Sequence, residues 1–256
     1  MLDSVPPRPA SARVADVVGN ADVEWDTFDS AAYFDHNYGE LRDDDKTIIN
    51  LVTEHFGQTC RTGVGSAIDV GTGANLYPGL IMLPYSARVV LSERAHSNRV
   101  WLNHELAEPS GSWQEFWKRI AEDSPPHQRI RNPFDLLHRY ARVERGNIFN
   151  LAAGQHDLGT MFFVAESITT RDDEFRRATG LFVNSLKPGA PFAAAFMRNS
   201  SGYYVAGQRF PACSINENDV EKALAPVARN VDIKTVESND LRDGYCGMMV
   251  ALGRRK

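Results

Sequence analysis

Residues 67–75, with the sequence AIDVGTGAN, constrain the fold of this chain more than any other segment. The apolar side chains at its start predict a buried parallel strand. Gly71 and Gly73 then allow a sharp turn and let a ligand approach bare backbone. Apolar residues at helical spacing follow over 76–83, and a second apolar strand ends at Glu93. This succession of strand, glycine turn, helix, strand and acid is typical of a nucleotide-binding half-fold, in which the acid accepts hydrogen bonds from ribose hydroxyls.

Length and charge exclude several classes of protein. With 256 residues, 43% of them hydrophobic, the chain can form one large domain with a substantial core. A net charge of -5 argues against a nucleic-acid surface. No apolar run approaches the ~20 residues that span a membrane, and the 3 cysteines lack the spacing of a metal site. We therefore expect a cytoplasmic monomer or weak homodimer with no metal site and no nucleic-acid or membrane partner.

The N-terminal part divides into an arm and the start of a single domain over 25–256. Residues 1–24 are polar and weakly patterned, which predicts a disordered arm. Residues 25–58 form the next segment, with five aromatic side chains within 25–38. These aromatic residues either pack on the body as an ordinary helix or form a lid whose tyrosines close over a ligand. The acids at 43–45 suit the start of a helix, where the dipole favours them, and a metal site there is disfavoured because consecutive helical residues do not converge.

Strands and helices alternate through the rest of the chain. Apolar strands are predicted over 160–165 and 191–197, and two adjacent strands, over 231–237 and 245–252, close the chain. Because a short loop joins these last two strands, they must be antiparallel neighbours. Residues 109–140 are long for a connection between a helix and a strand, so we expect a helical insertion that lies over the active site.

Polar residues and glycines fall at or just after the predicted strand ends, where open α/β sheets bind ligands. They are Asp69, Gly71, Gly73, Glu93, Asn147 and Glu166. A dinucleotide fingerprint needs a third glycine three residues after Gly73, but Leu76 stands there and crowds the phosphate site. A dinucleotide-dependent oxidoreductase is therefore disfavoured. S-adenosylmethionine, a nucleoside cofactor without phosphate, fits better, with its ribose on Glu93 and its sulfonium near tyrosine faces.

Four stretches of the sequence resemble the small-molecule methyltransferase family that includes nicotinamide, phenylethanolamine and indolethylamine N-methyltransferases. They are a lid motif over 28–39, a cofactor motif over 68–77, a Lys-Pro-Gly turn within 185–189 and a Tyr-Tyr-x-x-Gly stretch within 201–210. The Lys-Pro-Gly turn is common to many methyltransferases, whereas the lid and the Tyr-Tyr-x-x-Gly stretch are more specific. The resemblance implies a Rossmann-like class I α/β fold with a mostly parallel seven-stranded sheet, an antiparallel C-terminal strand, helices on both faces and an N-terminal helical lid.

The resemblance also implies roles for single residues. The expected cofactor site consists of Tyr33, Tyr38, Asp69, Gly71, Thr72, Gly73, Tyr77, Glu93, Arg94, Asn98, Asn147 and Ile148. The expected substrate site consists of Glu166, Met197, Arg198, Tyr203 and Tyr204. Met197 and Arg198 stand at or near positions where relatives carry acids, and Asn37 replaces a family tyrosine. Nicotinamide and catechol amines are therefore disfavoured as acceptors.

Methyl transfer is an in-line displacement for which a protein supplies proximity, alignment and exclusion of water. Glu166 and Tyr33 are the predicted catalytic residues, with Glu166 as a base or hydrogen-bonding partner. The alternative for Glu166 is a structural carboxylate that caps a nearby helix. The expected acceptor is a small amine or N-heteroaromatic, indole-like metabolite. Methylation of carbon or oxygen in an aromatic natural-product intermediate, and a protein that binds S-adenosylmethionine without turnover, are the alternatives.

Overall fold

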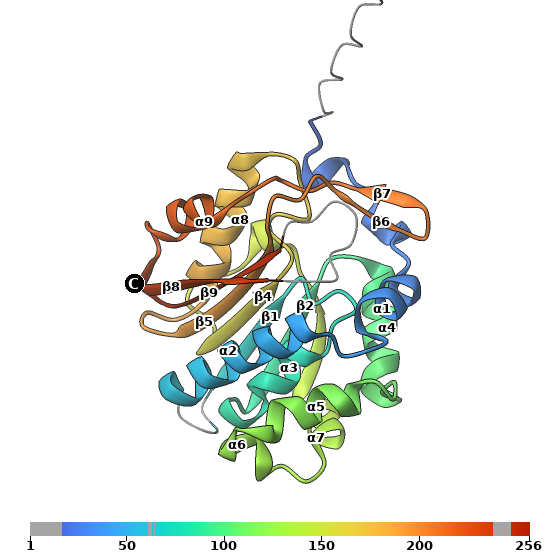
Figure 1. The fold of residues 1–256 in the computed structure, drawn as a ribbon, viewed down its shortest axis with the longest axis vertical. Helices are drawn as coiled ribbons and strands as arrows, with labels where there is room; N and C mark the ends of the chain where they lie inside the picture. The colour runs from blue at the N-terminus through green and yellow to red at the C-terminus, as the bar shows by residue number, and fades with distance from the viewer. Residues whose placement is uncertain (1–16, 61–62, 64, 238–246) are drawn as a thin grey trace, which may run out of the picture.

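A twisted sheet of seven strands forms the centre of the computed structural model, which describes residues 17–60, 63, 65–237 and 247–256 (Figure 1). The strand order is β3-β2-β1-β4-β5-β9-β8. The bounds are β1 Ser66–Val70, β2 Arg88–Glu93, β3 Ala141–Arg145, β4 Leu158–Phe162, β5 Pro191–Met197, β8 Ala228–Val236 and β9 Met248–Arg255. Every neighbouring pair is parallel except the two pairs that contain β9. The predicted sheet, with its antiparallel C-terminal strand, is confirmed.

Helices cover both faces of the sheet, as predicted. Their bounds are α1 Ser30–Tyr38, α2 Asp43–Thr59, α3 Tyr77–Met82, α4 His96–Ala107, α5 Trp113–Glu122, α6 Pro125–Gln128, α7 Pro133–Tyr140, α8 Asp172–Ser185 and α9 Glu217–Leu224. One core cluster joins α2, α3 and α5 to the sheet, through residues such as Ile49, Leu80 and Phe116. A second cluster joins α8 and α9 to the opposite face. Within the described residues, none of the helices combines the length and the apolar character that a membrane crossing requires.

The helical insertion over 109–140 exists, but the prediction that it lies over the active site is wrong. Its helix α5 packs against α2 and α3, α7 packs against α3 and α4, and α6 packs against α5, at the bottom of Figure 1. Trp113, Phe116 and Ile120 point into the core from one face of α5. Since the apolar face of α5 is buried against α2 and α3, the insertion extends the core and lines neither of the cavities described below.

The folded domain begins at least eight residues earlier than the sequence predicted, counting from residue 17 rather than 25. The Val18 N–H donates to Thr170 Oγ1 at 2.8 Å, and the Asn20 N–H donates to Glu174 Oε2 at 2.8 Å. A 3₁₀-helix, η1 Asn20–Asp22, follows, so this segment is tied to the start of α8. The remainder of the predicted arm lies outside the described residues.

The Tyr-Tyr-x-x-Gly stretch forms a small hairpin. Its two strands are β6 Tyr203–Val205 and β7 Gln208–Phe210. The hairpin packs on the N-terminal segment, where Phe210 stacks on Trp25 with ring centroids 5.7 Å apart and contacts Phe28 at 5.1 Å. The N-terminal lid and the hairpin therefore form one aromatic cluster.

Candidate active site

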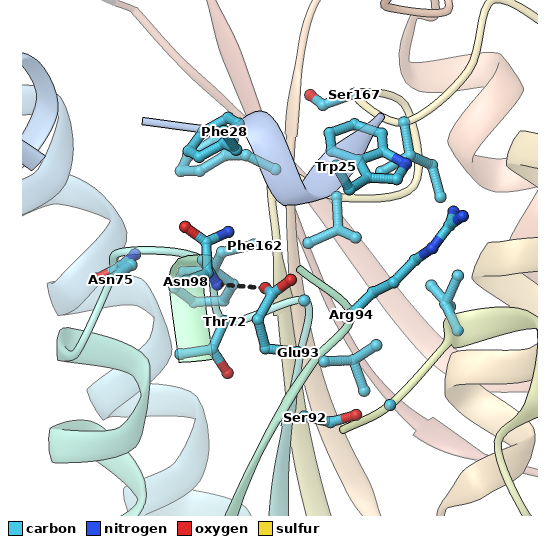
Figure 2. A pocket seen from close by; sticks show the side chains of 18 of the residues that line it. Trp25, Phe28, Thr72, Asn75, Ser92, Glu93, Arg94, Asn98, Phe162 and Ser167 are labelled. Atoms are coloured by element: carbon cyan, nitrogen blue, oxygen red, sulfur yellow. Dashed lines mark hydrogen bonds between the residues drawn. The ribbon is translucent and has the colours of Figure 1, made fainter. Parts of the chain in front are cut away.

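The carboxyl ends of β1 and β2 border a cavity beneath the N-terminal segment, here called the cofactor cavity (Figure 2). Most of the predicted cofactor residues line it. They are Tyr33, Tyr38, Gly71, Thr72, Gly73, Glu93, Arg94, Asn98, Asn147 and Ile148. Asn20 and Phe163 also line the cavity, and sequence spacing gave no sign of them. Asn75, the last residue of the glycine-rich stretch, lines it as well. The strand-end signal therefore located the cavity but not all of its walls.

The glycine turn after β1 has a conformation that only glycine adopts readily. Gly71 has a φ of +68°, and its N–H donates to the Ser92 carbonyl at 2.8 Å. A Cβ on Gly71 would lie 2.6 Å from Cγ1 of Val164. Gly73 has a φ of +60°, but a Cβ there would meet nothing closer than 3.8 Å. The two glycines thus differ: Gly71 is required by packing, and Gly73 leaves open space beside the cavity.

Glu93 braces the glycine turn against the start of α4. Its Oε2 accepts the Gly73 N–H at 2.8 Å, and its Oε1 accepts the Ala95 N–H at 2.7 Å. The Asn98 amide also donates to this carboxylate, as the dashed line in Figure 2 shows, while Ser30 Oγ donates to Asn98 Oδ1 at 2.7 Å. Burial raises the pKa of Glu93, although these hydrogen bonds oppose the shift. The carboxylate therefore fixes the shape of the cavity and still faces into it.

A hydrogen-bonded group from the N-terminal segment closes the cofactor cavity. The Trp25 indole N–H donates to Asn20 Oδ1 at 3.0 Å. The Arg94 guanidinium donates to the same oxygen and to the Asn20 carbonyl, both at 2.9 Å. The aromatic density of residues 25–38 was the sequence signal for this lid, and Tyr33 and Tyr38 in the cavity wall agree with it. Asn20 gave no signal because its role depends on Arg94, 74 positions away.

A second cavity, here called the acceptor cavity, adjoins the first. Five residues line both: Tyr33, Tyr38, Phe163, Ser167 and Tyr203. The far end of the acceptor cavity is formed by Asn37, Asp44, Asp45, Met197 and Met248. Of the predicted substrate residues, only Met197 and Tyr203 line the acceptor cavity. The shared residues form the junction between the two cavities.

A tight turn after β4 brings Phe163 to this junction. The predicted strand over 160–165 ends at Phe162, because Phe163 adopts a φ of +59° that no strand residue has. Its N–H donates to the Ala195 carbonyl of β5 at 2.7 Å. A non-glycine residue held in this region is uncommon and is often found at functional sites.

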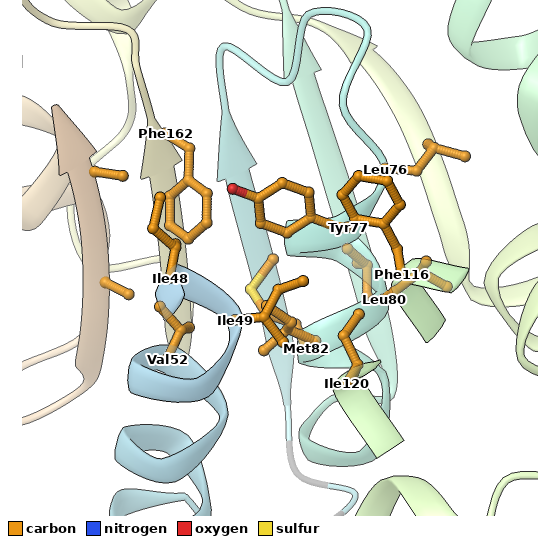
Figure 3. Close-up of a cluster of buried hydrophobic side chains, with 14 of the residues drawn as sticks. Ile48, Ile49, Val52, Leu76, Tyr77, Leu80, Met82, Phe116, Ile120 and Phe162 are labelled. Carbon is orange, nitrogen blue, oxygen red and sulfur yellow. The ribbon is translucent and has the colours of Figure 1, made fainter. Parts of the chain in front are cut away.

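Two predicted cofactor residues, Asp69 and Tyr77, line neither cavity. Asp69 is buried beneath the turn and accepts a hydrogen bond from Thr160 Oγ1 at 2.6 Å, and burial raises its pKa to about 7. Tyr77 is fully buried in the core and stacks on Phe116 with centroids 5.5 Å apart (Figure 3). Both residues therefore hold the cofactor turn from behind and do not face the cavity, which corrects the prediction.

The predictions for Arg198 and Tyr204 are also corrected. Arg198 turns away from the acceptor cavity, and its Nε lies 2.9 Å from Glu217 Oε1 on α9. Tyr204 is 69% exposed and borders a hollow on the outer side of α1, whereas its neighbour Tyr203 faces inward. Successive side chains of a strand point to opposite faces, so only one of this tyrosine pair can face the site.

Glu166 is completely buried and lines neither cavity, so the structure does not place it against a substrate. Its Oε1 accepts the Met197 N–H at 2.9 Å and the Ser167 hydroxyl at 3.3 Å. It thus holds two residues of the acceptor cavity in place. Neither printed donor belongs to a helix, so among the described residues Glu166 does not cap a helix as the structural alternative predicted, and its Oε2 has no partner there.

The buried Glu166 carboxyl gives a prediction about stability. Burial raises its pKa from 4.5 to about 7, so its contribution to stability is complete below pH 4.5 and is lost as the pH rises through 7. That loss is on the order of 3 kcal/mol. Glu166→Gln removes this pH dependence. The melting temperature of the variant minus that of the wild type should therefore increase between pH 5 and pH 8. Calorimetry at several pH values tests this, and a constant difference would contradict it.

Comparison with known proteins agrees with this architecture. An N1-methyltransferase of 1,6-didemethyltoxoflavin from Burkholderia thailandensis, solved with that compound and S-adenosylhomocysteine, is 13% identical, with a TM-score of 0.53 over 89% of this chain and 84% of that chain. An S-adenosylmethionine-dependent methyltransferase from Clostridium acetobutylicum is 13% identical, with a TM-score of 0.51 over 88% and 96%. At this identity the likeness shows the fold. No curated protein sequence matches the chain.

The sequence family is shown by a different comparison. The model of the NNMT/PNMT/TEMT family matches residues 17–255. The match starts where the described structure starts and includes the lid, the glycine turn and the hairpin. The protein is an enzyme with S-adenosylmethionine as its cofactor, and the chain belongs to the NNMT/PNMT/TEMT family of methyltransferases.

Proposed function

We propose that this enzyme methylates a nitrogen of a small amine or N-heteroaromatic metabolite held in the acceptor cavity. The observation that carries the proposal is the junction, where Tyr33, Phe163 and Ser167 belong to the walls of both cavities. A methyl donor and an acceptor bound on either side of this junction would be in contact. The 1,6-didemethyltoxoflavin bound to the Burkholderia thailandensis N1-methyltransferase of similar fold is in keeping with such an acceptor.

The residues of the cofactor cavity fit S-adenosylmethionine. Glu93 would accept hydrogen bonds from its ribose, and Asn147 and Ile148 would border its adenine. Asn75 is 5% exposed and its Oδ1 accepts the Tyr77 N–H at 3.1 Å, but its Nδ2 has no partner in the described part of the structure. This orphaned donor suits the carboxylate of the cofactor. When bound, S-adenosylmethionine supplies an electrophilic methyl group on a positively charged sulfur.

The chain itself supplies position and a dry environment for the transfer. The aromatic rings of Tyr33, Tyr38 and Tyr203 would attract the positively charged sulfur of the cofactor. The lid and the hairpin close the site through the stacking of Trp25 on Phe210. Because an amine nitrogen attacks with its own lone pair, it needs no base for the attack itself. This agrees with the position of Glu166 behind the wall, and it leaves Tyr33 as the predicted catalytic residue that touches both ligands.

Calorimetry with two nucleosides and one dinucleotide tests the cofactor site. We expect the wild-type protein to bind S-adenosylhomocysteine and 5′-methylthioadenosine, and to bind NAD far more weakly. Leu76 itself does not crowd the cavity as the sequence predicted, because its side chain is buried in the core. Asn75→Ala should weaken the binding of S-adenosylhomocysteine by about tenfold, as expected for the loss of a hydrogen bond to a charged group. It should leave 5′-methylthioadenosine, which lacks the amino-acid part, nearly unchanged. An equal loss for both ligands would refute the assignment of Asn75, and tight NAD binding alone would refute the proposed function.

A further inference from the structure

Three buried polar side chains connect the lid helix α1 to the wall of the cofactor cavity. Ser30, the first residue of α1, donates its hydroxyl to Asn98 Oδ1 at 2.7 Å. The Asn98 amide donates in turn to the Glu93 carboxylate (Figure 2). Ser30, Asn98 and Glu93 are 6%, 5% and 6% exposed. Asn98 and Glu93 line the cofactor cavity, whereas Ser30 lines neither cavity and reaches the site only through them.

The Ser30 hydroxyl determines which end of the Asn98 amide faces Glu93. An amide carries an acceptor oxygen at one end and a donor nitrogen at the other. While Ser30 donates to the oxygen, the nitrogen faces the carboxylate, which is the favourable orientation. Without the hydroxyl, the buried oxygen of Asn98 loses this donor, and a buried acceptor without a donor is costly. A reversed amide would turn its oxygen toward the carboxylate and repel it. Ser30 therefore acts on Glu93 without touching it.

The same hydroxyl fixes the first turn of the lid helix. Tyr33 comes three residues after Ser30, and residues three apart lie on the same face of a helix. Tyr33 lines both cavities at their junction. The hydrogen bond that orients the Asn98 amide thus also holds the turn of α1 from which Tyr33 reaches the junction.

Other contacts of the connection between β2 and α4 hold the lid as well. The Arg94 guanidinium donates to Asn20, and the His96 N–H donates to Asp26 Oδ1 at 2.6 Å. On its other side the connection holds the glycine turn, because Glu93 accepts the Gly73 N–H. The lid and the floor of the cofactor cavity are therefore attached to one short segment of chain.

We propose that Ser30 is a positioning residue that, through Asn98 and Glu93, makes the ordering of the lid and the binding of the cofactor depend on each other. This inference rests on the proposed placement of the ribose on Glu93. When α1 is in place, Asn98 keeps its nitrogen on Glu93, and the carboxylate stays where it can accept a ribose hydroxyl. A cofactor that holds Glu93 favours the same orientation of Asn98 and hence its contact with Ser30. Such coupling is reciprocal, so the cofactor orders α1 by as much as α1 strengthens the binding of the cofactor.

Calorimetry with S-adenosylhomocysteine tests the route from Ser30 to the cofactor. Ser30→Ala should weaken binding about fivefold, as expected for the loss of one buried hydrogen bond. In the Asn98→Ala background the same change should cost no further affinity, because the hydroxyl then has no amide to orient. Thr27→Val is the matched control, since it removes an exposed lid hydroxyl that donates to the Glu24 carbonyl at 2.7 Å, and it should leave the affinity unchanged. An equal loss from Ser30→Ala in both backgrounds, or no loss in either, would overturn the role of Ser30.

Hydrogen exchange tests the reciprocal effect and needs no variant for its first result. S-adenosylhomocysteine should slow the exchange of the amides of α1 in the wild type, and it should slow them less in Ser30→Ala. Phe34 contacts Trp101 with ring centroids 5.1 Å apart, so α1 stays packed on α4 in this variant. No protection of α1 in the wild type, or equal protection in the variant, would overturn the inference while the cofactor site stands. No binding of S-adenosylhomocysteine by the wild type would overturn the proposed function and this inference with it.

Discussion

Gly71→Ala is expected to lower the free energy of unfolding by about 2–5 kcal/mol and to abolish measurable binding of S-adenosylhomocysteine. Two effects add. A left-handed backbone costs a residue with a Cβ about 1–2 kcal/mol, and Gly71 has a φ of +68°. Overpacking costs about 1–3 kcal/mol, and the new Cβ would lie 2.6 Å from Val164. Because the turn between Gly71 and Gly73 forms the floor of the cofactor cavity, any shift that relieves this clash also deforms the cavity.

Gly73→Ala is the matched control for this prediction. Its φ of +60° carries the same backbone cost, but the space around the new Cβ is open. We expect a loss of only about 1–2 kcal/mol in stability together with weaker cofactor binding, since the methyl group enters space beside the cavity. Denaturant unfolding and calorimetry measure the two effects separately. If both variants lost the same stability, contact with Val164 would not be what requires glycine at position 71.

The cofactor side of the site could be predicted from the sequence because its signals are local. A strand, a turn and the acid after the next strand are set by periodicity and by glycine, and parallel strands bring their carboxyl ends together. Gly71, Gly73 and Glu93 therefore fell where the sequence placed them. Asp69 and Tyr77 did not, because nearness to the motif in sequence says nothing about which side of the turn a side chain occupies.

The acceptor side could not be predicted in the same way. Acids are common at the start of a helix, so nothing in the sequence suggested another role for Asp44 and Asp45. The structure shows that both also line the acceptor cavity. Only tertiary packing shows that they face inward while Asp43 faces solvent. The position of Glu166 was misjudged because the predicted strand was too long. The left-handed turn at Phe163 ends β4 four residues before the acid, which therefore enters the interior.

Glu93→Ala is expected to weaken the binding of S-adenosylhomocysteine by about 1–3 kcal/mol, the loss expected when a charge-assisted hydrogen-bond partner is removed. Each carboxylate oxygen of Glu93 accepts one backbone N–H, from Gly73 or Ala95. The Asn98 amide donates to the same carboxylate. A carboxylate has about four acceptor positions, so about one remains for a ribose hydroxyl. The variant should also be less stable, because both buried N–H groups lose their acceptor. Glu93→Gln keeps an oxygen in place and should lose less of both.

Analogues of S-adenosylhomocysteine without the 2′ or the 3′ hydroxyl separate the ribose contact from this structural role. If Glu93 accepts a ribose hydroxyl, the wild type should bind the matching deoxy analogue more weakly, whereas Glu93→Ala should bind it as well as the parent compound, since one interaction cannot be lost twice. Losses that simply add, for both analogues, would mean that the ribose lies elsewhere. Glu93 would then act only as the brace between the glycine turn and α4, and its removal would weaken the cofactor by deforming the cavity.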